Sequence, residues 1–89
     1  MDNLEKYDAI AKRLRETYIQ KNEKYGNSFD KSLEKYGLIS ALTRISDKFN
    51  RLETLILNND NGTTDESLQD TCEDMANYLI MLAKYIESK

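Results

Sequence analysis

The stretch Lys21-Asn22-Glu23-Lys24-Tyr25-Gly26-Asn27-Ser28-Phe29 marks the point where the first long helix of this chain stops and the next one begins. Glycine often ends a helix, because it adopts the left-handed conformation without strain. Asn27 or Ser28 is then suited to cap the helix that follows. The stretch carries more amide, hydroxyl and ammonium groups than a helix stop needs. It therefore has two interpretations, a well-capped turn or a binding site for an anion such as phosphate.

Hydrophobic residues recur every three or four positions on both sides of this stretch, which is typical of amphipathic helices. Gly37 and the polar segment Asn58-Asn59-Asp60-Asn61-Gly62 are further breaks. The helices expected from this pattern run from about Asp2 to Lys24, Phe29 to Tyr36, Leu38 to Asn58, and onward from Thr63 or Thr64, where Thr63-x-x-Glu66 fits a capping box. The sequence thus predicts one all-α domain over residues 1–89, with three main helices and a short connecting helix.

Each long helix carries one apolar stripe that we expect to form the core. The three stripes are Leu4, Tyr7, Ala11, Leu14 and Tyr18; Leu38, Leu42, Ile45, Phe49, Leu52 and Ile56; and Leu68, Cys72, Met75, Leu79, Leu82 and Ile86. A chain of 89 residues with 39% hydrophobic content has little apolar surface for a self-sufficient core. Ile80 and Met81 also lie off the last stripe. We therefore expect a homo-oligomer, either a dimer or a dimer-based assembly, that completes the helical bundle.

The composition excludes several classes of function. The chain has no histidine and one cysteine, Cys72, so neither a Cys/His zinc site nor an internal disulfide is possible. No basic stripe is available to neutralise the phosphates of duplex nucleic acid. No apolar run approaches the roughly 18 residues of a membrane span, and no signal segment precedes the first helix. These features predict a cytoplasmic protein without a membrane partner.

Two further polar groups accompany the Lys21–Phe29 stretch. Glu66, Asp70, Glu73 and Asn77 fall on one strip of the last helix, opposite its apolar stripe, with Asp74 at the margin of the strip. Arg44, Asp47 and Arg51 lie away from the apolar stripe of the preceding helix. They form either interhelical salt bridges or a polar cleft that holds phosphates, directly or through Mg²⁺. Tyr25 and Tyr78 lie within the polar runs, where they can stack on a base or cover the edge of the core.

Three sequence blocks resemble a known family. They are Lys21-Asn22-x-x-Tyr25-Gly26-Asn27-Ser28-Phe29, then Arg44-Ile45-Ser46-Asp47-Lys48-Phe49-Asn50-Arg51-Leu52, then Asp65-Glu66-Ser67-x-x-Asp70-Thr71-x-x-Asp74-x-Ala76-Asn77-Tyr78. In this order they resemble nucleotide modification associated domain 1, a family of small phage and bacterial proteins. That family is distantly similar to the all-α nucleoside triphosphate pyrophosphohydrolases of the MazG and dimeric dUTPase type. The resemblance implies a helical oligomer with a nucleotide site.

The pyrophosphohydrolases bind Mg²⁺ through an E-x-x-E pair on one helix and an E-x-x-D pair on a later one. This chain departs from the pattern, with Asp47 in place of the first pair and acids at a spacing of four on the last helix. If the resemblance extends to hydrolysis, the metal ligands are Asp47, Glu66, Asp70 and Asp74, and Glu73 is the candidate general base. Arginines in place of acids instead favour holding phosphate without metal.

We therefore expect a small phage-type protein that binds a nucleotide without turnover and sequesters it in the host cytoplasm, for example a signalling nucleotide of host defence. Lys21, Lys24, Arg44 and Arg51 would contact phosphates, while Asn22, Asn27 and Asn77 would read ribose or base. The other expected ligand-binding residues are Tyr25, Gly26, Ser28, Lys48 and Tyr78. One alternative is a Mg²⁺-dependent nucleotide pyrophosphohydrolase. The other is a helical oligomerisation module without a ligand.

Overall fold

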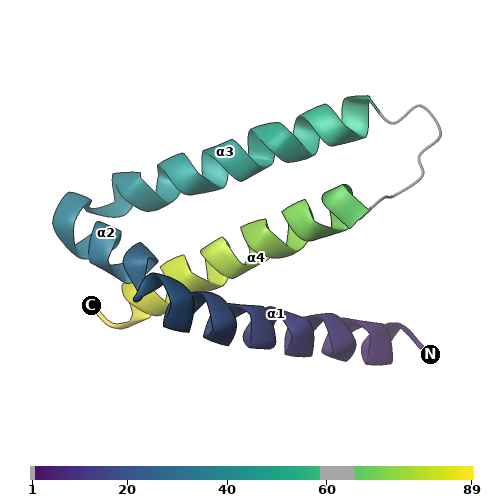
Figure 1. Cartoon of the computed structure of the whole chain (residues 1–89), viewed down its shortest axis with the longest axis horizontal. Coiled ribbons are helices and arrows are strands. Elements are labelled where there is room, and N and C mark those ends of the chain that lie inside the picture. The colour runs from purple at the N-terminus through teal and green to yellow at the C-terminus, as the bar shows by residue number, and fades with distance from the viewer. Residues whose placement is uncertain (1, 59–65) are drawn as a thin grey trace.

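The computed structural model describes residues 2–58 and 66–89. The described chain is all-α, as predicted, and its helices are α1 (Asn3–Tyr25), α2 (Ser28–Tyr36), α3 (Leu38–Leu57) and α4 (Glu66–Glu87). Figure 1 shows α3 and α4 running antiparallel, α2 closing one end of this pair, and α1 lying along α4. Three long helices and one short connector therefore make up the fold. The predicted turn after Asn58 and the capping box at Thr63 fall outside the described residues.

The helix ends follow the local chemistry of the sequence. Asp2 caps α1 by accepting a hydrogen bond from the backbone N–H of Glu5 at 2.8 Å. Gly26 ends α1 with φ of 63°, and its N–H donates to the carbonyl of Asn22. Asn27 is also left-handed, with φ of 61°, and its side chain makes no capping hydrogen bond. The expected side-chain cap at Asn27 is thus wrong, because two consecutive left-handed residues already reverse the chain.

The buried core is small and lies where α2 meets α3 and α4. Phe29, Leu33 and Ala41 are buried there. The half-buried side chains that pack against them come from the second half of α4, and they are Tyr78, Met81, Leu82 and Tyr85. No residue of α1 is buried. The closed end of the α3–α4 pair is therefore the best-packed part of the described chain.

The apolar stripes predicted as core are largely exposed in the single chain, which corrects that expectation. We call Leu38, Leu42, Ile45, Phe49, Leu52 and Ile56 the α3 stripe, and Leu68, Cys72, Met75, Leu79, Leu82 and Ile86 the α4 stripe. Phe49 is 50% exposed and Leu79 is 47% exposed, and Cys72 is exposed rather than buried. Tyr7 of α1 is 71% exposed. A period of 3.6 residues shows which side chains share a face, but not which neighbour that face meets.

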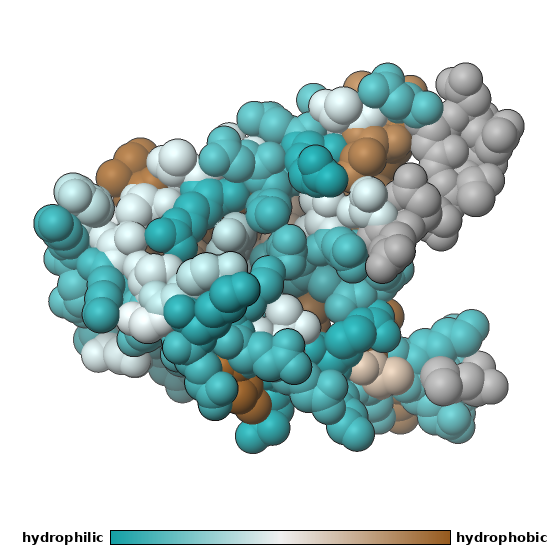
Figure 2. All heavy atoms as spheres, viewed as in Figure 1, coloured by the Kyte–Doolittle hydropathy of each residue, from teal (hydrophilic) through white to brown (hydrophobic). Residues whose placement is uncertain are grey.

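Polar side chains occupy much of the space between α3 and α4 instead. Lys48 and Arg51 of α3 bind Asp74 and Thr71 of α4, and Thr71 is buried. Figure 2 shows a face of the molecule covered mainly by hydrophilic residues. In the part of the chain that the structure describes, no helix has the length and apolar character to cross a membrane.

Candidate functional site

A cavity of about 190 Å³ opens where the end of α1, the start of α2, the first half of α3 and the middle of α4 converge. It is lined by Tyr18, Lys21, Asn22, Tyr25, Ser28, Phe29, Arg44, Asp74, Asn77, Tyr78 and Met81. The Lys21–Phe29 stretch forms one wall, because the sharp reversal at Gly26 and Asn27 turns both helix ends toward the same space. The turn therefore positions a site, and the two interpretations of this stretch are compatible.

Lys21 and Arg44 are the two basic side chains in the cavity lining. The Nζ atom of Lys21 donates to Oδ1 of Asp74 at 3.2 Å, and Nζ of Lys48 donates to Oδ2 of the same carboxylate at 3.1 Å. Asp74 thus bridges α1 and α3 from its place on α4. With one carboxylate between two ammonium groups, this corner keeps a net positive charge that attracts an anion.

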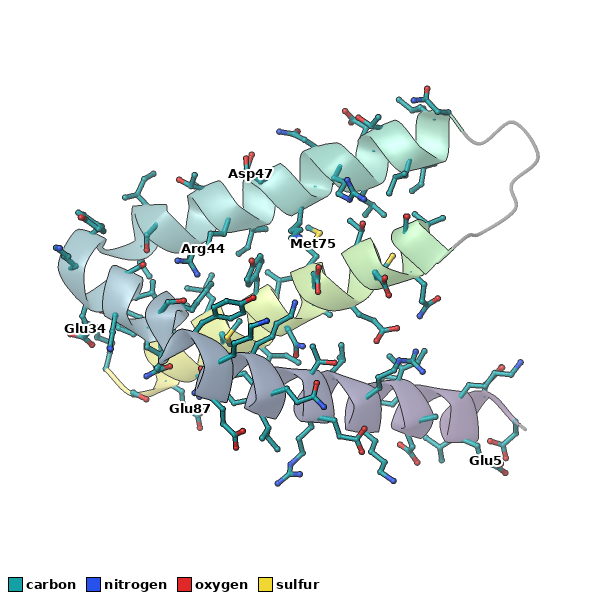
Figure 3. The ribbon with its side chains drawn as sticks, viewed as in Figure 1. Glu5, Glu34, Arg44, Asp47, Met75 and Glu87 are labelled. Atoms are coloured by element: carbon teal, nitrogen blue, oxygen red, sulfur yellow. The ribbon has the colours of Figure 1, made fainter. Side chains whose placement is uncertain are left out.

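Arg44 is held in place by contacts from α2. Its guanidinium lies over the ring of Phe29, 5.4 Å from the ring centroid, and its Nη2 donates to Oγ of Ser32 at 3.2 Å. Figure 3 shows Arg44 reaching from α3 toward the interior of the molecule, whereas Asp47 is exposed and does not line the cavity. These contacts fix the orientation of the guanidinium, whose planar fork suits bidentate binding of phosphate.

Aromatic rings form the floor of the cavity. The rings of Phe29 and Tyr78 are stacked, with centroids 5.5 Å apart and an interplanar angle of 17°. Tyr25, at 58% exposure, stands at the rim, and Tyr18 lines the side toward α1. Such a set offers an apolar surface on which a planar base can stack.

Asn77 is the buried polar residue of the cavity. It is 9% exposed, and its Nδ2 donates to the backbone carbonyl of Leu14 at 3.1 Å. This bond attaches α1 to α4, so Asn77 positions the wall that carries Lys21 and Asn22. Its role is therefore at least partly structural, beyond the predicted contact with ribose or base.

The structure brings together seven of the residues predicted to bind ligand and leaves five outside the cavity lining. Those in the lining are Lys21, Asn22, Tyr25, Ser28, Arg44, Asn77 and Tyr78. Gly26 and Asn27 form the turn behind the wall, and Lys24 lies over the ring of Tyr25. Lys48 reaches the site only through Asp74, and Arg51 donates to Oγ1 of Thr71 at 3.2 Å.

The predicted metal ligands are not gathered into one group. Among the residues that the structure describes, no three His, Cys, Asp or Glu side chains lie close enough together to hold a metal ion. Asp74 lines the cavity, whereas Asp47 and Asp70 are exposed and absent from its lining. The side chain of Glu66 falls outside the described part of the chain. The described donors of one chain therefore do not fit the expected Mg²⁺ site.

Glu73, the candidate general base, points toward α1 and does not line the cavity. Arg13 donates to both of its carboxylate oxygens, at 2.8 and 2.7 Å, and Gln69 donates to one of them at 2.7 Å. The hydrogen bond from Arg13 lowers the pKa of the Glu73 carboxyl below its ordinary value of 4.5. A carboxylate that is held ionised in this way is a weak proton acceptor.

Sequence reasoning missed three of the lining residues and the partner of Glu73. The sequence places Tyr18 in a predicted core stripe, Phe29 at the end of the polar stretch and Met81 off the last apolar stripe. Tyr18 lies three and four positions before Lys21 and Asn22, and Met81 lies four positions after Asn77, so each shares a helix face with a polar lining residue. Phe29 directly follows Ser28. Arg13 carried no signal, because its contact with Glu73 joins residues 60 positions apart.

The fold and the cavity together define a small all-α protein with a basic, aromatic-lined site at the junction of its helices. Residues 21–83, more than two thirds of the chain, match the family described as nucleotide modification associated domain 1. The chain therefore belongs to this family. No curated protein and no solved structure matches the chain.

Proposed function

We propose that this protein binds a phosphate-containing nucleotide in the cavity and holds it without turnover. The observation that carries the proposal is the convergence of Lys21, Arg44 and stacked aromatic rings on one cavity from four different helices. Phosphate, ribose and base each need a different chemistry, and the lining supplies cations, amide and hydroxyl groups, and ring faces. The family description, which refers to nucleotide modification, agrees with a nucleotide ligand.

The polarity of the lining suggests how the ligand lies. A phosphate between Lys21 and Arg44 would accept charge-assisted hydrogen bonds from both side chains. Asn22 and Ser28 are within the same wall and suit the ribose hydroxyls, while Tyr25 and Tyr78 suit the base. A volume of about 190 Å³ is below the roughly 300–1,000 Å³ of sites that enclose a drug-sized ligand. Part of the nucleotide would therefore extend from the cavity into solvent.

The charge of the site favours a ligand with few phosphates. Lys21 and Arg44 contribute two positive charges to the lining, and Asp74 contributes one negative charge. A nucleotide with one phosphate or one phosphodiester group matches this balance better than a triphosphate does, because each additional unpaired phosphate would face Asp74. We therefore propose that the protein sequesters a nucleotide of this kind, for example a signalling nucleotide in the host cytoplasm.

We favour binding over hydrolysis because the carboxylates that a hydrolase would need, Asp74 and Glu73, are already engaged in ion pairs with basic side chains. Pyrophosphate hydrolysis in this kind of site requires acids that are available to a metal ion and a base that accepts a proton from water. Asp74 is shared by Lys21 and Lys48, and Glu73 is bound by Arg13. Each carboxylate would have to exchange its basic partner for metal or water before it could serve the reaction.

A thermal-shift screen of the pure protein tests the proposal. The panel contains nucleoside mono- and triphosphates, ADP-ribose and cyclic dinucleotides, each with Mg²⁺ and with EDTA, followed by chromatography of every ligand that raises Tm. Stabilisation in EDTA by a ligand that elutes unchanged is the expected result. A ligand that needs Mg²⁺ and is recovered as a monophosphate would instead establish the pyrophosphohydrolase. No shift with any compound would overturn nucleotide binding and favour the oligomerisation module.

A further inference from the structure

The α3 stripe and the α4 stripe lie on the same side of the antiparallel α3–α4 pair. At 100° per residue, the α4 stripe is centred roughly 90° around the helix from the residues that face α3, such as Thr71 and Tyr78. The α3 stripe is likewise roughly 90° from the residues that face α4, such as Lys48 and Arg51, and in the same rotational sense. Because the two helices run in opposite directions (Figure 1), equal rotations bring both stripes to one side.

The exposed fractions agree with this register. Ile45 and Leu52, which lie at the edge of the α3 stripe nearest α4, are half-buried, and so are Met75 and Leu82 on the matching edge of the α4 stripe. The outer members point to solvent, with exposed fractions of 59% for Leu42 and 55% for Ile86. The two stripes therefore form one continuous apolar face, which we call the hairpin face.

Helix α1 lies on the other side of the pair. Its contacts reach Glu73, Asp74, Asn77 and Lys84 of α4. These residues lie roughly 90° from the α3-facing residues in the opposite rotational sense to the α4 stripe. Leu79, at the outer edge of the hairpin face, lines a second cavity together with Tyr7, Ala11 and Leu14 of α1. The other members of the face line neither this cavity nor the first one, and its twelve residues include no charged side chain.

The dimensions of the chain indicate how much surface remains to be covered. The accessible surface is 6811 Å², about 1,400 Å² more than the roughly 5,400 Å² of a compact monomer of 10.4 kDa. The radius of gyration is 14.5 Å, against about 12 Å for a compact domain of this length. A standard protein interface removes about 800 Å² from each partner. The surplus is thus large enough for one such interface.

We propose that the hairpin face binds the hairpin face of a second copy of this chain in a two-fold symmetric dimer. In such a dimer each residue of the face meets its own copy or a neighbour from the same face. A charged residue would then oppose a like charge, and the face has none. The result is a bundle of two α3 and two α4 helices, with both α1 helices and both cavities on the outside. Each nucleotide site is then built within one chain.

Sedimentation equilibrium and light-scattering chromatography test this dimer, without nucleotide and over a range of micromolar concentrations. We expect the wild type at twice 10.4 kDa. Phe49→Glu and Ile86→Glu each place a carboxylate on the hairpin face and should yield the monomer mass. Ile39→Glu is the matched control, because Ile39 is 62% exposed but lies on α3 roughly 90° away from the stripe. This control should remain dimeric.

A second measurement keeps the test decisive if the acidic variants fail to fold. The Tm of a dimer rises with protein concentration, whereas that of a monomer does not. A wild-type protein that is helical by circular dichroism, monomeric at all concentrations and constant in Tm would overturn the dimer. Equal dissociation by Ile39→Glu would overturn the assignment of the face. Since Arg44 lies off the hairpin face, Arg44→Ala should stay dimeric, so loss of nucleotide binding and loss of assembly are observed separately.

Discussion

The two sides of the α3–α4 pair have opposite characters, although they belong to the same helices. On one side, Glu73, Asp74 and Asn77 bind α1 through hydrogen bonds, and the cavity opens beside them. On the other side, the hairpin face is apolar over the length of both helices. The comparison teaches that the interior of the single chain is partly polar while a broad apolar surface is external. The polar side suits a ligand, and the apolar side suits another protein surface.

The largest effect should come from the small core that joins the two sides. Leu33 is 1% exposed and packs between α2, α3 and α4. Leu33→Ala should lower the free energy of unfolding by about 2–5 kcal/mol. Thermal melts followed by circular dichroism would then show a Tm lower by roughly 10 °C or more. Leu57→Ala, at a position 73% exposed, is the control and should change Tm little. Equal effects of the two substitutions would show that the core lies elsewhere.

A large effect on nucleotide affinity is also expected when Arg44, on the polar side of the molecule, is substituted. Arg44→Ala removes a guanidinium held over Phe29 and should weaken nucleotide affinity about 10- to 100-fold, the usual value of a lost charge-assisted hydrogen bond. Isothermal titration calorimetry with a nucleotide found in the screen measures the change. Lys24→Ala is the matched control, since Lys24 is basic and close by but does not line the cavity. An unchanged affinity for Arg44→Ala would remove Arg44 from the site.

Substitution of Asp74 should have a moderate effect of opposite sign, an increase in nucleotide affinity. Asp74→Asn removes the carboxylate that binds Lys21 and Lys48, so both ammonium groups become available to phosphate. Affinity in EDTA should rise roughly 3- to 10-fold, because a like charge beside the phosphate is gone. The increase should shrink as salt concentration rises. A loss of binding in Mg²⁺ would show instead that Asp74 acts as a metal ligand and would favour the pyrophosphohydrolase.

The smallest effect concerns the pH dependence of the α1–α4 contact. The hydrogen bond from Arg13 holds the pKa of Glu73 below its ordinary 4.5, so the pair stabilises the folded state above that pH and loses its contribution as pH falls through the lowered pKa. Glu73→Gln should therefore lower Tm slightly at pH 7, and the difference from the wild type should vanish in acid. Melting curves from pH 7 to pH 3 test this. Arg13→Ala, which removes the donor of the same hydrogen bonds, should show the same trend.

Much of the fold could be predicted from the sequence because its signals are local. Glycines at positions 26 and 37 end helices as expected, and apolar spacing gave the helices their length. The sequence correctly predicts which apolar residues share a face of each helix, but the prediction that these faces are buried in the single chain is wrong. The period of a stripe does not reveal whether it faces its own chain or another surface. Only the polar contacts between Arg51 and Thr71 and between Lys48 and Asp74 settle which faces meet.

The candidate site was predictable where its residues are contiguous and less so where they are not. Lys21, Asn22, Tyr25 and Ser28 lie within one stretch, and the turn brings them to one wall. Arg44 and Tyr78 come from distant helices and were included because they fall in polar runs. The same reasoning included Arg51, which faces Thr71 two turns further along α3 and away from the cavity.

The attachment of α1 has a consequence for local opening of the structure. No residue of α1 is buried, and its hydrogen bonds and ion pairs with α4 come from Arg13, Leu14, Tyr18 and Lys21. The free energy needed to detach such a helix is well below that of global unfolding. Amide hydrogen exchange should therefore be fastest in α1, and a ligand that contacts Lys21 and Asn22 should slow it. Detachment of α1, which supplies one wall of the cavity, would then open the cavity for the ligand to enter or leave.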